Sequence, residues 1–171
     1  TRLVREYAGD NPRNQAFLSV MPQQQISSSM PAALIHWKKM RDSFYEIEDI
    51  EEDWEEILSS YDTDNNHQIK AIGPLTQFIM ENISNEYNLD ELINHDSKFK
   101  TFILTVKGLI ERNRGEKIIV FSFFKMTLAY LNKRLKEEGI ESVMIYGGMK
   151  NQEELINNFQ DPNGPNILLA S

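Results

Sequence analysis

The feature that most constrains the fold is a regular alternation of helix-like and strand-like patterns through residues 96–171. Each apolar run of strand length is preceded by a segment whose apolar residues recur at helical spacing. Helix before strand, repeated along a chain, predicts an α/β fold in which right-handed crossover helices join the strands of a parallel sheet. The strand-like runs are KIIVFSF at 117–123, SVMIYGG at 142–148 and NILLAS at 166–171, and the helix-like segments are 96–115, 124–139 and 151–159.

Residues at the ends of these segments support the division. Asp96 or Ser97 is expected to cap the first helix and Asn151 the last, because such side chains accept hydrogen bonds from the free amides of a helix start. Gly115 and Gly139 stand where the first two helices should stop. The sequence therefore predicts the bounds of the helices as well as their order.

The run KIIVFSF is apolar without polar alternation, which is typical of a strand covered on both faces. We therefore expect Phe121, and either Phe123 or Phe124, to lie in the core. The helical pattern begins within a residue or two of the run, so Ser122 stands where a strand ends and a helix starts.

Two further regions precede this one. Residues 1–40 are expected to be helical, with Ser29 as a cap. Residues 41–95 form an acidic helical insertion: between Arg41 and His67 eleven acids face one Lys or Arg, a net charge of −10 that leaves +2 of the total −8 to the rest of the chain. This segment would repel nucleic acid, so we expect it to be solvated or to offer a docking surface to a basic protein partner.

Two stretches resemble metal sites but lack what such sites need. Residues 62–73 carry the first oxygen ligands of a calcium loop, but His67 replaces the glycine of its sharp turn and Gly73 replaces its bidentate glutamate. The acidic pair in LDEL, at 89–92, follows no buried strand, so these acids are expected to belong to a helix start. The sequence therefore predicts no metal site.

Bulk properties exclude several classes of protein. No apolar stretch approaches the roughly 20 residues of a membrane span, and the start of the chain lacks the layout of a secretory signal. The chain contains no cysteine, which excludes disulfides and thiolate metal sites and suits a reducing compartment. We expect a cytoplasmic protein without membrane contact.

Ligands of parallel α/β sheets bind at the carboxyl ends of the strands. The residues that follow the three strand-like runs supply hydroxyl groups, a positive charge and two glycines that let a backbone approach closely, a set that suits phosphate. Each residue alone also fits a helix cap, a solvated charge or a plain turn. The candidate site residues are Ser122, Lys125, Gly147, Gly148 and Ser171.

Four short motifs mark the ends of these elements: FSFF at 121–124, IYG at 145–147, FQ at 159–160 and LLAS at 168–171. Their order and spacing resemble the C-terminal RecA-like lobe of the DEAD/DEAH-box helicase superfamily, most closely its Swi/Snf-type DNA translocases. The resemblance covers residues 96–171. The upstream stretch QQQISSSMPAAL is also similar to a helical segment that bacterial members carry before this lobe.

The resemblance implies a partial RecA-like sheet whose site residues, named above, face the sugar-phosphate backbone of one DNA strand. Base identity would not be read, because backbone contacts position a protein without carrying sequence information. The parent protein would bind ATP and Mg²⁺ and convert ATP hydrolysis into translocation along DNA. Its N-terminal helicase lobe would be a partner of this one.

The sequence also departs from the family. It has no G-x-x-x-x-G-K-[ST] loop for the ATP phosphates, and the helix after the glycine turn offers only Lys150 where an arginine is expected. The chain stops at Ser171, before the rest of the fifth motif and the arginine finger, which can be worth several powers of ten in rate. We therefore expect a truncated lobe that has no catalytic residue of its own and hydrolyses no ATP alone. Turnover by the 171 residues would contradict this expectation.

Two other classes of function fit the same pattern. A flavodoxin-like α/β binding module would show the same order of elements and would hold a small anionic ligand at Gly147 and Gly148. A protein-interaction domain would instead use the acidic helices of residues 41–95 to hold a basic partner.

Overall fold

The computed structural model describes residues 20, 22–42, 87–113 and 115–171. The chain forms two compact units, Thr1–His95 and Asp96–Ser171, and each is considered by itself. Residues 43–67 of the acidic segment and the whole calcium-like loop at 62–73 lie outside the described residues. In the described part of the chain, no helix is both long and apolar enough to cross a membrane.

In the first unit, residues 22–28 are helical and α3 follows at Met30–Asp42. The Ser29 hydroxyl accepts a hydrogen bond from the Ala32 amide at 3.3 Å, which confirms this serine as the cap of α3. Trp37 is buried, and its indole nitrogen donates to the side-chain oxygen of Gln25 at 2.8 Å. This hydrogen bond ties α3 to the helical turns before it.

A short helix, α6, runs over Leu89–Asn94. The Asn88 side chain accepts a hydrogen bond from the Asp90 amide at 3.0 Å, and Asp90 and Glu91 lie in the first turn. Carboxylates at this end favour a helix because they oppose the positive end of its dipole. The prediction that LDEL marks a helix start is confirmed.

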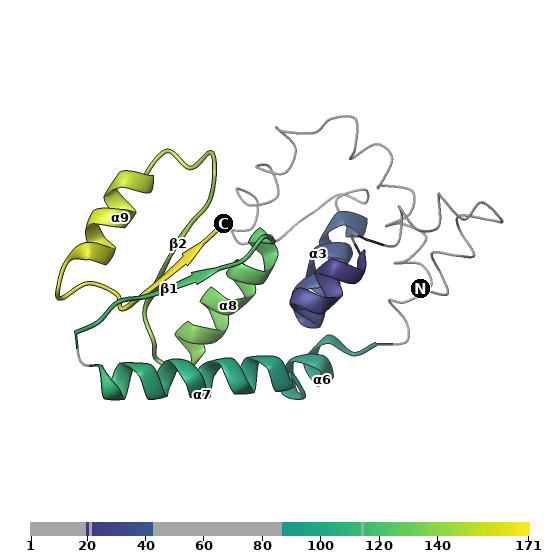
Figure 1. The fold of residues 1–171 in the computed structure, drawn as a ribbon. Coiled ribbons are helices and arrows are strands. Elements are labelled where there is room, and N and C mark those ends of the chain that lie inside the picture. Colours follow the sequence, from purple (N-terminus) through teal and green to yellow (C-terminus); the bar gives the residue numbers. More distant parts are fainter. Residues whose placement is uncertain (1–19, 21, 43–86, 114) are drawn as a thin grey trace. The chain divides into compact units, whose positions relative to one another are not determined.

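The second unit alternates three helices with three strands that all run parallel, in the order β1-β3-β2 across the sheet (Figure 1). The predicted α/β class is confirmed, and the arrangement is that of a partial RecA-like sheet with flanking helices. The elements are α7 (Ser97–Arg112), β1 (Ile118–Phe121), α8 (Lys125–Glu137), β2 (Ser142–Ile145), α9 (Gln152–Gln160) and β3 (Ile167–Ala170).

The helix ends lie where the sequence places them. The Asp96 carboxylate accepts a hydrogen bond from the Phe99 amide at 2.9 Å and caps α7. Asn151 occupies the N-cap position of α9, although its side chain makes no cap hydrogen bond. Gly115 and Gly139 follow the ends of α7 and α8 with positive φ, as helix stops commonly do.

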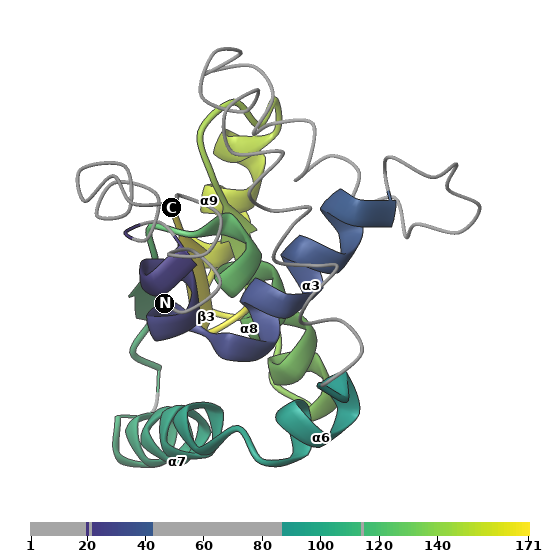
Figure 2. The ribbon, with the colours of Figure 1, turned by 90° about the vertical axis from the view of Figure 1, so that its right-hand side faces the viewer.

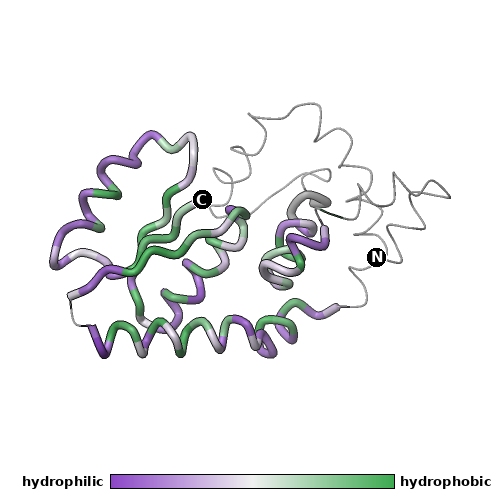
Figure 3. Tube along the Cα trace, in the orientation of Figure 1, coloured by the Kyte–Doolittle hydropathy of each residue, from purple (hydrophilic) through white to green (hydrophobic). Residues whose placement is uncertain are grey.

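The larger core lies between one face of the sheet and the helices α7 and α8. Figure 3 shows the strands as the most continuously apolar part of the unit. Most of the buried residues of this core are leucine or isoleucine, and each one that is fully buried contributes about 2 kcal/mol. The buried residues of this core are Phe99, Ile103, Val106, Leu128, Leu135, Ile167 and Leu169.

Among the described elements, α9 covers the opposite face of the sheet. Phe159 of α9 packs on Val143 of β2 and Leu168 of β3, with Ile145 and Leu155 around them. Figures 1 and 2 show α9 and α7 on opposite sides of the sheet. Because α9 packs on β2 and β3, no described helix covers β1 on this face.

One prediction about β1 is wrong for that reason. Ile118 and Val120 pack against the larger core, but Ile119 is 51% exposed and Phe121 is 77% exposed on the other face. An apolar run without alternation is compatible with burial on both faces, yet β1 is an edge strand that pairs only with β3 among the described strands. The expectation that Phe121 lies in the core is therefore corrected.

The phenylalanines after β1 divide in the same way. Phe124 is buried, whereas Phe123 is 81% exposed. Of the two residues that were expected as alternatives for the core, Phe124 is therefore the one that lies in it. Their rings meet edge to face, with centroids 5.3 Å apart and planes at 81°. The exposed ring thus packs with one edge contact against the buried one.

At the amino edge of the sheet, Lys117 closes the turn between α9 and β3. Its ammonium donates to the carbonyl oxygens of Asp161 at 2.7 Å, Gly164 at 3.1 Å and Pro165 at 3.2 Å. It also lies 5.8 Å from the ring centroid of Phe159, within reach of a cation–π attraction. A single lysine therefore satisfies three backbone acceptors that the turn leaves open.

A polar chain connects α7 to α8. The Tyr130 hydroxyl donates to the second carboxylate oxygen of Asp96 at 2.8 Å and accepts from the Arg134 guanidinium at 3.1 Å. The same guanidinium lies 4.3 Å from the ring centroid of Phe99. Burial, together with the hydrogen bond to the Asp96 carboxylate, raises the pKa of Tyr130 well above its usual value.

Candidate nucleic-acid interface

The ends of the three strands lie in register, which brings their following residues to one edge. Phe121 pairs with Ala170, and Ala170 pairs with Ile145 on the other side. The pairing continues one residue further, because the Ser122 amide donates to the Ala170 carbonyl and the Ser171 amide donates to the Ile145 carbonyl, both at 3.1 Å. Ser122 and Ser171 are therefore fixed by sheet hydrogen bonds at the carboxyl edge.

Ser122 shapes the passage from β1 into α8. Its hydroxyl oxygen accepts from the Phe124 amide at 3.2 Å and lies 3.4 Å from the Phe124 carbonyl oxygen. The N-cap of α8 is Phe124, not Ser122, and the Phe124 side chain makes no capping hydrogen bond. The long donor contact is weak, so the hydroxyl proton could turn to a stronger acceptor such as a phosphate oxygen.

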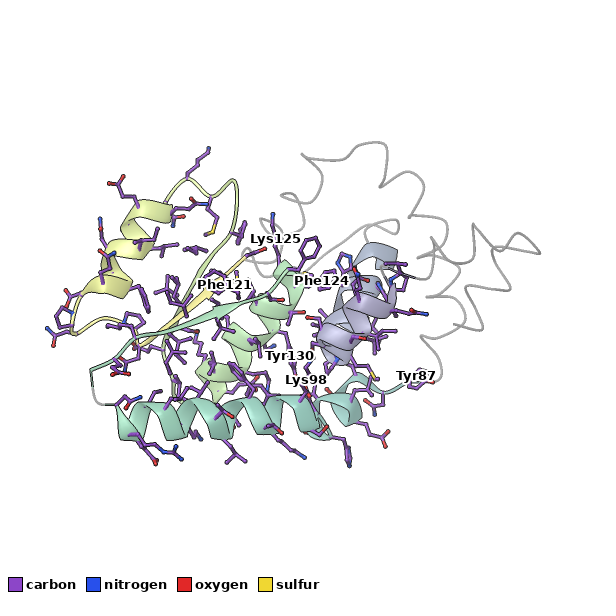
Figure 4. All side chains as sticks on the ribbon, in the orientation of Figure 1. Tyr87, Lys98, Phe121, Phe124, Lys125 and Tyr130 are labelled. Carbon is purple, nitrogen blue, oxygen red and sulfur yellow. The ribbon has the colours of Figure 1, made fainter. Side chains whose placement is uncertain are left out.

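Lys125 is the first residue of α8, and its ammonium stands over a ring from the neighbouring loop. The Lys125 nitrogen is 4.8 Å from the ring centroid of Tyr146, which is buried directly after β2. A cation over an aromatic face is stabilised by the ring quadrupole, more so when water is partly excluded. This contact connects the loop after β1 to the loop after β2. Figure 4 shows Phe121, Phe124 and Lys125 around the end of β1 and the start of α8.

The glycine turn after β2 is open on its outer side. A Cβ built on Gly147 or Gly148 would meet no atom within 4 Å, and Gly148 has a φ of +93° that other residues rarely adopt. The turn is held from inside, since the Gln152 side-chain amide of α9 donates to the Tyr146 carbonyl. A ligand backbone could therefore approach the two glycines without meeting side chains.

The structure places all five predicted site residues at this edge: Ser122, Lys125, Gly147, Gly148 and Ser171. Their role as nucleic-acid contacts stays a prediction. In the parts of the chain with described coordinates, no group of His, Cys, Asp or Glu is arranged to hold a metal ion. The chemistry of the edge is that of hydroxyl, amide and ammonium donors, which suits an oxyanion.

Sequence reasoning missed two aromatic residues at this edge. The Tyr146 ring lies under the Lys125 ammonium. Its position at the end of a strand-like run, next to Gly147, is the sequence signal that could have identified it as a site residue. Phe123 was assigned to the core as an alternative to Phe124, but it is exposed. Phe123 follows the end of β1, and that position in the loop is the signal that could have predicted its exposure.

Comparison with known proteins agrees with this description of the second unit. Residues 97–171 match the family model for the helicase conserved C-terminal domain. Comparisons with curated proteins and with solved structures gave no significant match. The match supports a helicase-type, nucleic-acid-binding role and a partner N-terminal lobe, in a family that generally hydrolyses ATP. Residues 97–171 are thus similar to the C-terminal lobe of helicases, and their three-stranded parallel sheet is consistent with a partial RecA-like fold.

Proposed function

We propose that this chain contributes one strand-binding surface to an ATP-dependent DNA translocase of the Swi/Snf type. The observation that carries the proposal is the joint position of Ser122, Lys125 and the glycine turn at the carboxyl edge, within the region that matches the helicase domain. The Swi/Snf assignment rests on the FSFF, IYG, FQ and LLAS motifs quoted above.

The groups at the edge are matched to a sugar-phosphate backbone. Lys125 supplies a charge that is held in place by Tyr146, so less side-chain freedom is lost when it binds a phosphate. Ser122 and the backbone amides of the exposed glycine turn supply short-range donors. These groups do not distinguish bases, which suits a motor that moves over any sequence.

The ATP and Mg²⁺ of the parent enzyme belong to this proposal but not to the residues described here. The described residues hold no carboxylate cluster for a metal. We expect the purified 171-residue chain to hydrolyse no ATP, in the presence or absence of DNA. Phosphate release above the level of a buffer control would overturn that expectation.

The test of the proposed interface is the binding of two unrelated DNA duplexes, followed by fluorescence anisotropy at several salt concentrations. We expect equal affinities for the two sequences and a steep loss of affinity with salt, as phosphate contacts require. Lys125→Ala should weaken both affinities about five-fold and reduce the slope of log affinity against log salt by about 1.

Lys133→Ala is the matched control, because Lys133 lies on the same helix, is exposed and carries the same charge. Equal effects of the two substitutions would show that net charge, rather than the carboxyl edge, governs binding. If neither duplex binds while inorganic pyrophosphate does, a small-anion binding module replaces the translocase proposal.

A further inference from the structure

The outer face of α7, which is turned away from the strands in Figure 1, exposes apolar surface. Leu104 is 72% exposed, and helical geometry places it opposite the side chains that α7 buries, which are Phe99, Ile103 and Val106. A single exposed leucine is common on protein surfaces, so its surroundings decide whether it marks an interaction surface.

Two threonines on the same face extend the apolar surface of Leu104. The Thr101 hydroxyl donates to the Ser97 carbonyl oxygen at 3.0 Å, and the Thr105 hydroxyl donates to the Thr101 carbonyl oxygen at 2.9 Å. Because the helix backbone uses both hydroxyl protons, these side chains offer a partner chiefly their methyl groups. The three residues stand at i, i+3 and i+4, the spacing with which one helix contacts another.

Gly108 continues this face by one turn and leaves it flat. Glycine inside a helix is unfavourable relative to alanine, so a structural reason for it is expected. A Cβ at this position would meet only the Arg112 guanidinium among the described atoms, at 4.0 Å. The packing of the described residues therefore does not require glycine here, and the missing side chain lets the backbone of a partner approach α7 closely.

Basic side chains lie on both flanks of this apolar strip. The helix carries four Lys or Arg and one Glu, a net charge of +3. One flank carries Lys100 and Lys107, and the Lys107 ammonium is paired with the Glu138 carboxylate at 2.7 Å. The other flank carries Lys98 and Arg112. Even with one base balanced by Glu138, the flanks favour a partner that has acidic side chains on both sides of an apolar ridge.

We infer that the outer face of α7 is a docking surface for an acidic amphipathic helix of another protein. Apolar residues of that helix would pack on Leu104 and over Gly108, while its carboxylates would pair with the basic flanks. A second copy of this chain, docked through the same face, would set like charges against each other. Nucleic-acid phosphates would match the bases but would leave the apolar strip uncovered.

This inference goes beyond the proposed function, because none of the five residues of the proposed nucleic-acid interface lies on α7. The two surfaces can therefore be tested separately.

The test measures the binding of a designed, fluorescein-labelled acidic helix to the 171-residue chain by fluorescence anisotropy. The probe has about 20 residues, with leucines on one face and glutamates on its flanks. A second peptide has the same composition, with its leucines distributed around the helix. We expect the first peptide to bind about 5-fold more tightly than the second, and its affinity to fall with added salt.

Substitutions on α7 should weaken the binding of the amphipathic peptide. Leu104→Ala should weaken it about five-fold, and Gly108→Leu, which blocks close approach, at least as much. Alanine and leucine both suit an exposed helix position at least as well as the residues that they replace, so urea unfolding should show no loss of stability. Lys100→Gln should weaken binding and also reduce its dependence on salt.

Two control variants change equivalent groups away from α7. Ile119→Thr removes exposed apolar surface from β1 and keeps a β-branched side chain, and Lys133→Gln removes an exposed charge from α8. Both should bind the amphipathic peptide as the unmodified chain does. If either control weakens binding as much as Leu104→Ala, the peptide binds elsewhere and the inference is wrong.

Other outcomes would also overturn the inference. Equal binding of the two peptides would show that charge alone attracts them. If a DNA duplex displaces the peptide and Leu104→Ala has no effect, the bases of α7 serve phosphate binding. If sedimentation shows a dimer that Leu104→Glu disrupts, the face joins copies of this chain. The proposed function is judged by the effect of Lys125→Ala on DNA binding, so failure of the peptide test leaves it standing.

Discussion

The two edges of the parallel sheet are built differently, although each carries a glycine-containing turn beside α9. At the amino edge, Lys117 donates to three carbonyl oxygens of the turn, and a Cβ on Gly164 would stand 1.9 Å from the Asn158 carbonyl oxygen. At the carboxyl edge, a Cβ on Gly147 or Gly148 would meet nothing within 4 Å. One edge is closed by packing, and the other is open.

This difference shows what a glycine turn can and cannot indicate. Gly164 is required by the protein itself, because the space for a side chain is already filled by backbone. The space outside Gly147 and Gly148 is empty, so it is available to something that the chain does not supply. A glycine is therefore a candidate for ligand approach only where the structure leaves the outside of its turn open.

Gly164→Ala should have the largest effect on stability. The new methyl group would overlap the Asn158 carbonyl, and the backbone of the turn would have to move, with an expected loss of about 3 kcal/mol in the free energy of unfolding. Urea unfolding followed by circular dichroism measures this loss. A variant as stable as the unmodified chain would show that the amino edge is not closed in solution.

Lys117→Met tests the same edge through its hydrogen bonds. Methionine keeps the apolar stem but leaves the carbonyls of Asp161, Gly164 and Pro165 without the ammonium donor. Hydrogen bonds from charged donors contribute strongly, so we expect a loss of about 2 kcal/mol. The control is Lys133→Met, since Lys133 is exposed on α8 and its replacement should change stability by less than about 0.5 kcal/mol. Similar losses in both variants would assign the effect to charge alone.

The sequence was sufficient for the order of elements in the second unit because helix and strand periods differ sharply there, and caps such as Asp96 mark their ends. It was also sufficient to place Ser122, Lys125 and Ser171 at one edge, because strands that run parallel must end together. It could not show that β1 is an edge strand. Ile119 and Phe121 look the same in a local pattern whether or not a helix covers them, and only the order β1-β3-β2 shows that α9 does not reach them.

Long-range contacts were equally hidden. Lys117 is a lone lysine at the start of a strand-like run, and nothing nearby in sequence shows that it will close a turn more than forty residues later. The contact of Lys125 with Tyr146 likewise depends on two loops that meet only in the folded sheet. Both interactions follow from the strand order, which the local pattern does not encode.

Tyr130→Phe tests how much the hydrogen bonds between α7 and α8 contribute to stability, away from both edges of the sheet. The variant loses the hydrogen bonds of the hydroxyl with Asp96 and Arg134, and we expect it to be about 1 kcal/mol less stable at pH 8. The raised pKa of Tyr130 means that the folded state retains the phenol proton above pH ~10, where the unfolded state loses it.

Stability from this group is therefore complete below pH ~10 and declines as the pH rises further, by up to about 1.4 kcal/mol per pH unit. Phenylalanine cannot titrate, so the advantage of the unmodified chain should shrink between pH 8 and pH ~10.5. Urea unfolding of both proteins at the two pH values measures the change. A constant difference in unfolding free energy would contradict the raised pKa.

Gly147→Ala should have the smallest effect on stability and is the sharpest probe of the open edge. Its φ is not positive and its surroundings are empty, so alanine should change the unfolding free energy by less than about 0.5 kcal/mol. If a nucleic-acid backbone approaches this turn closely, as the proposed function requires, the methyl group should nonetheless weaken DNA binding about five-fold, equivalent to about 1 kcal/mol. Loss of stability comparable to Gly164→Ala would mean that the carboxyl edge is packed like the amino edge. Unchanged affinity with unchanged stability would mean that the space outside Gly147 receives no ligand backbone, and would leave Lys125 and Ser122 as the whole of the phosphate contact.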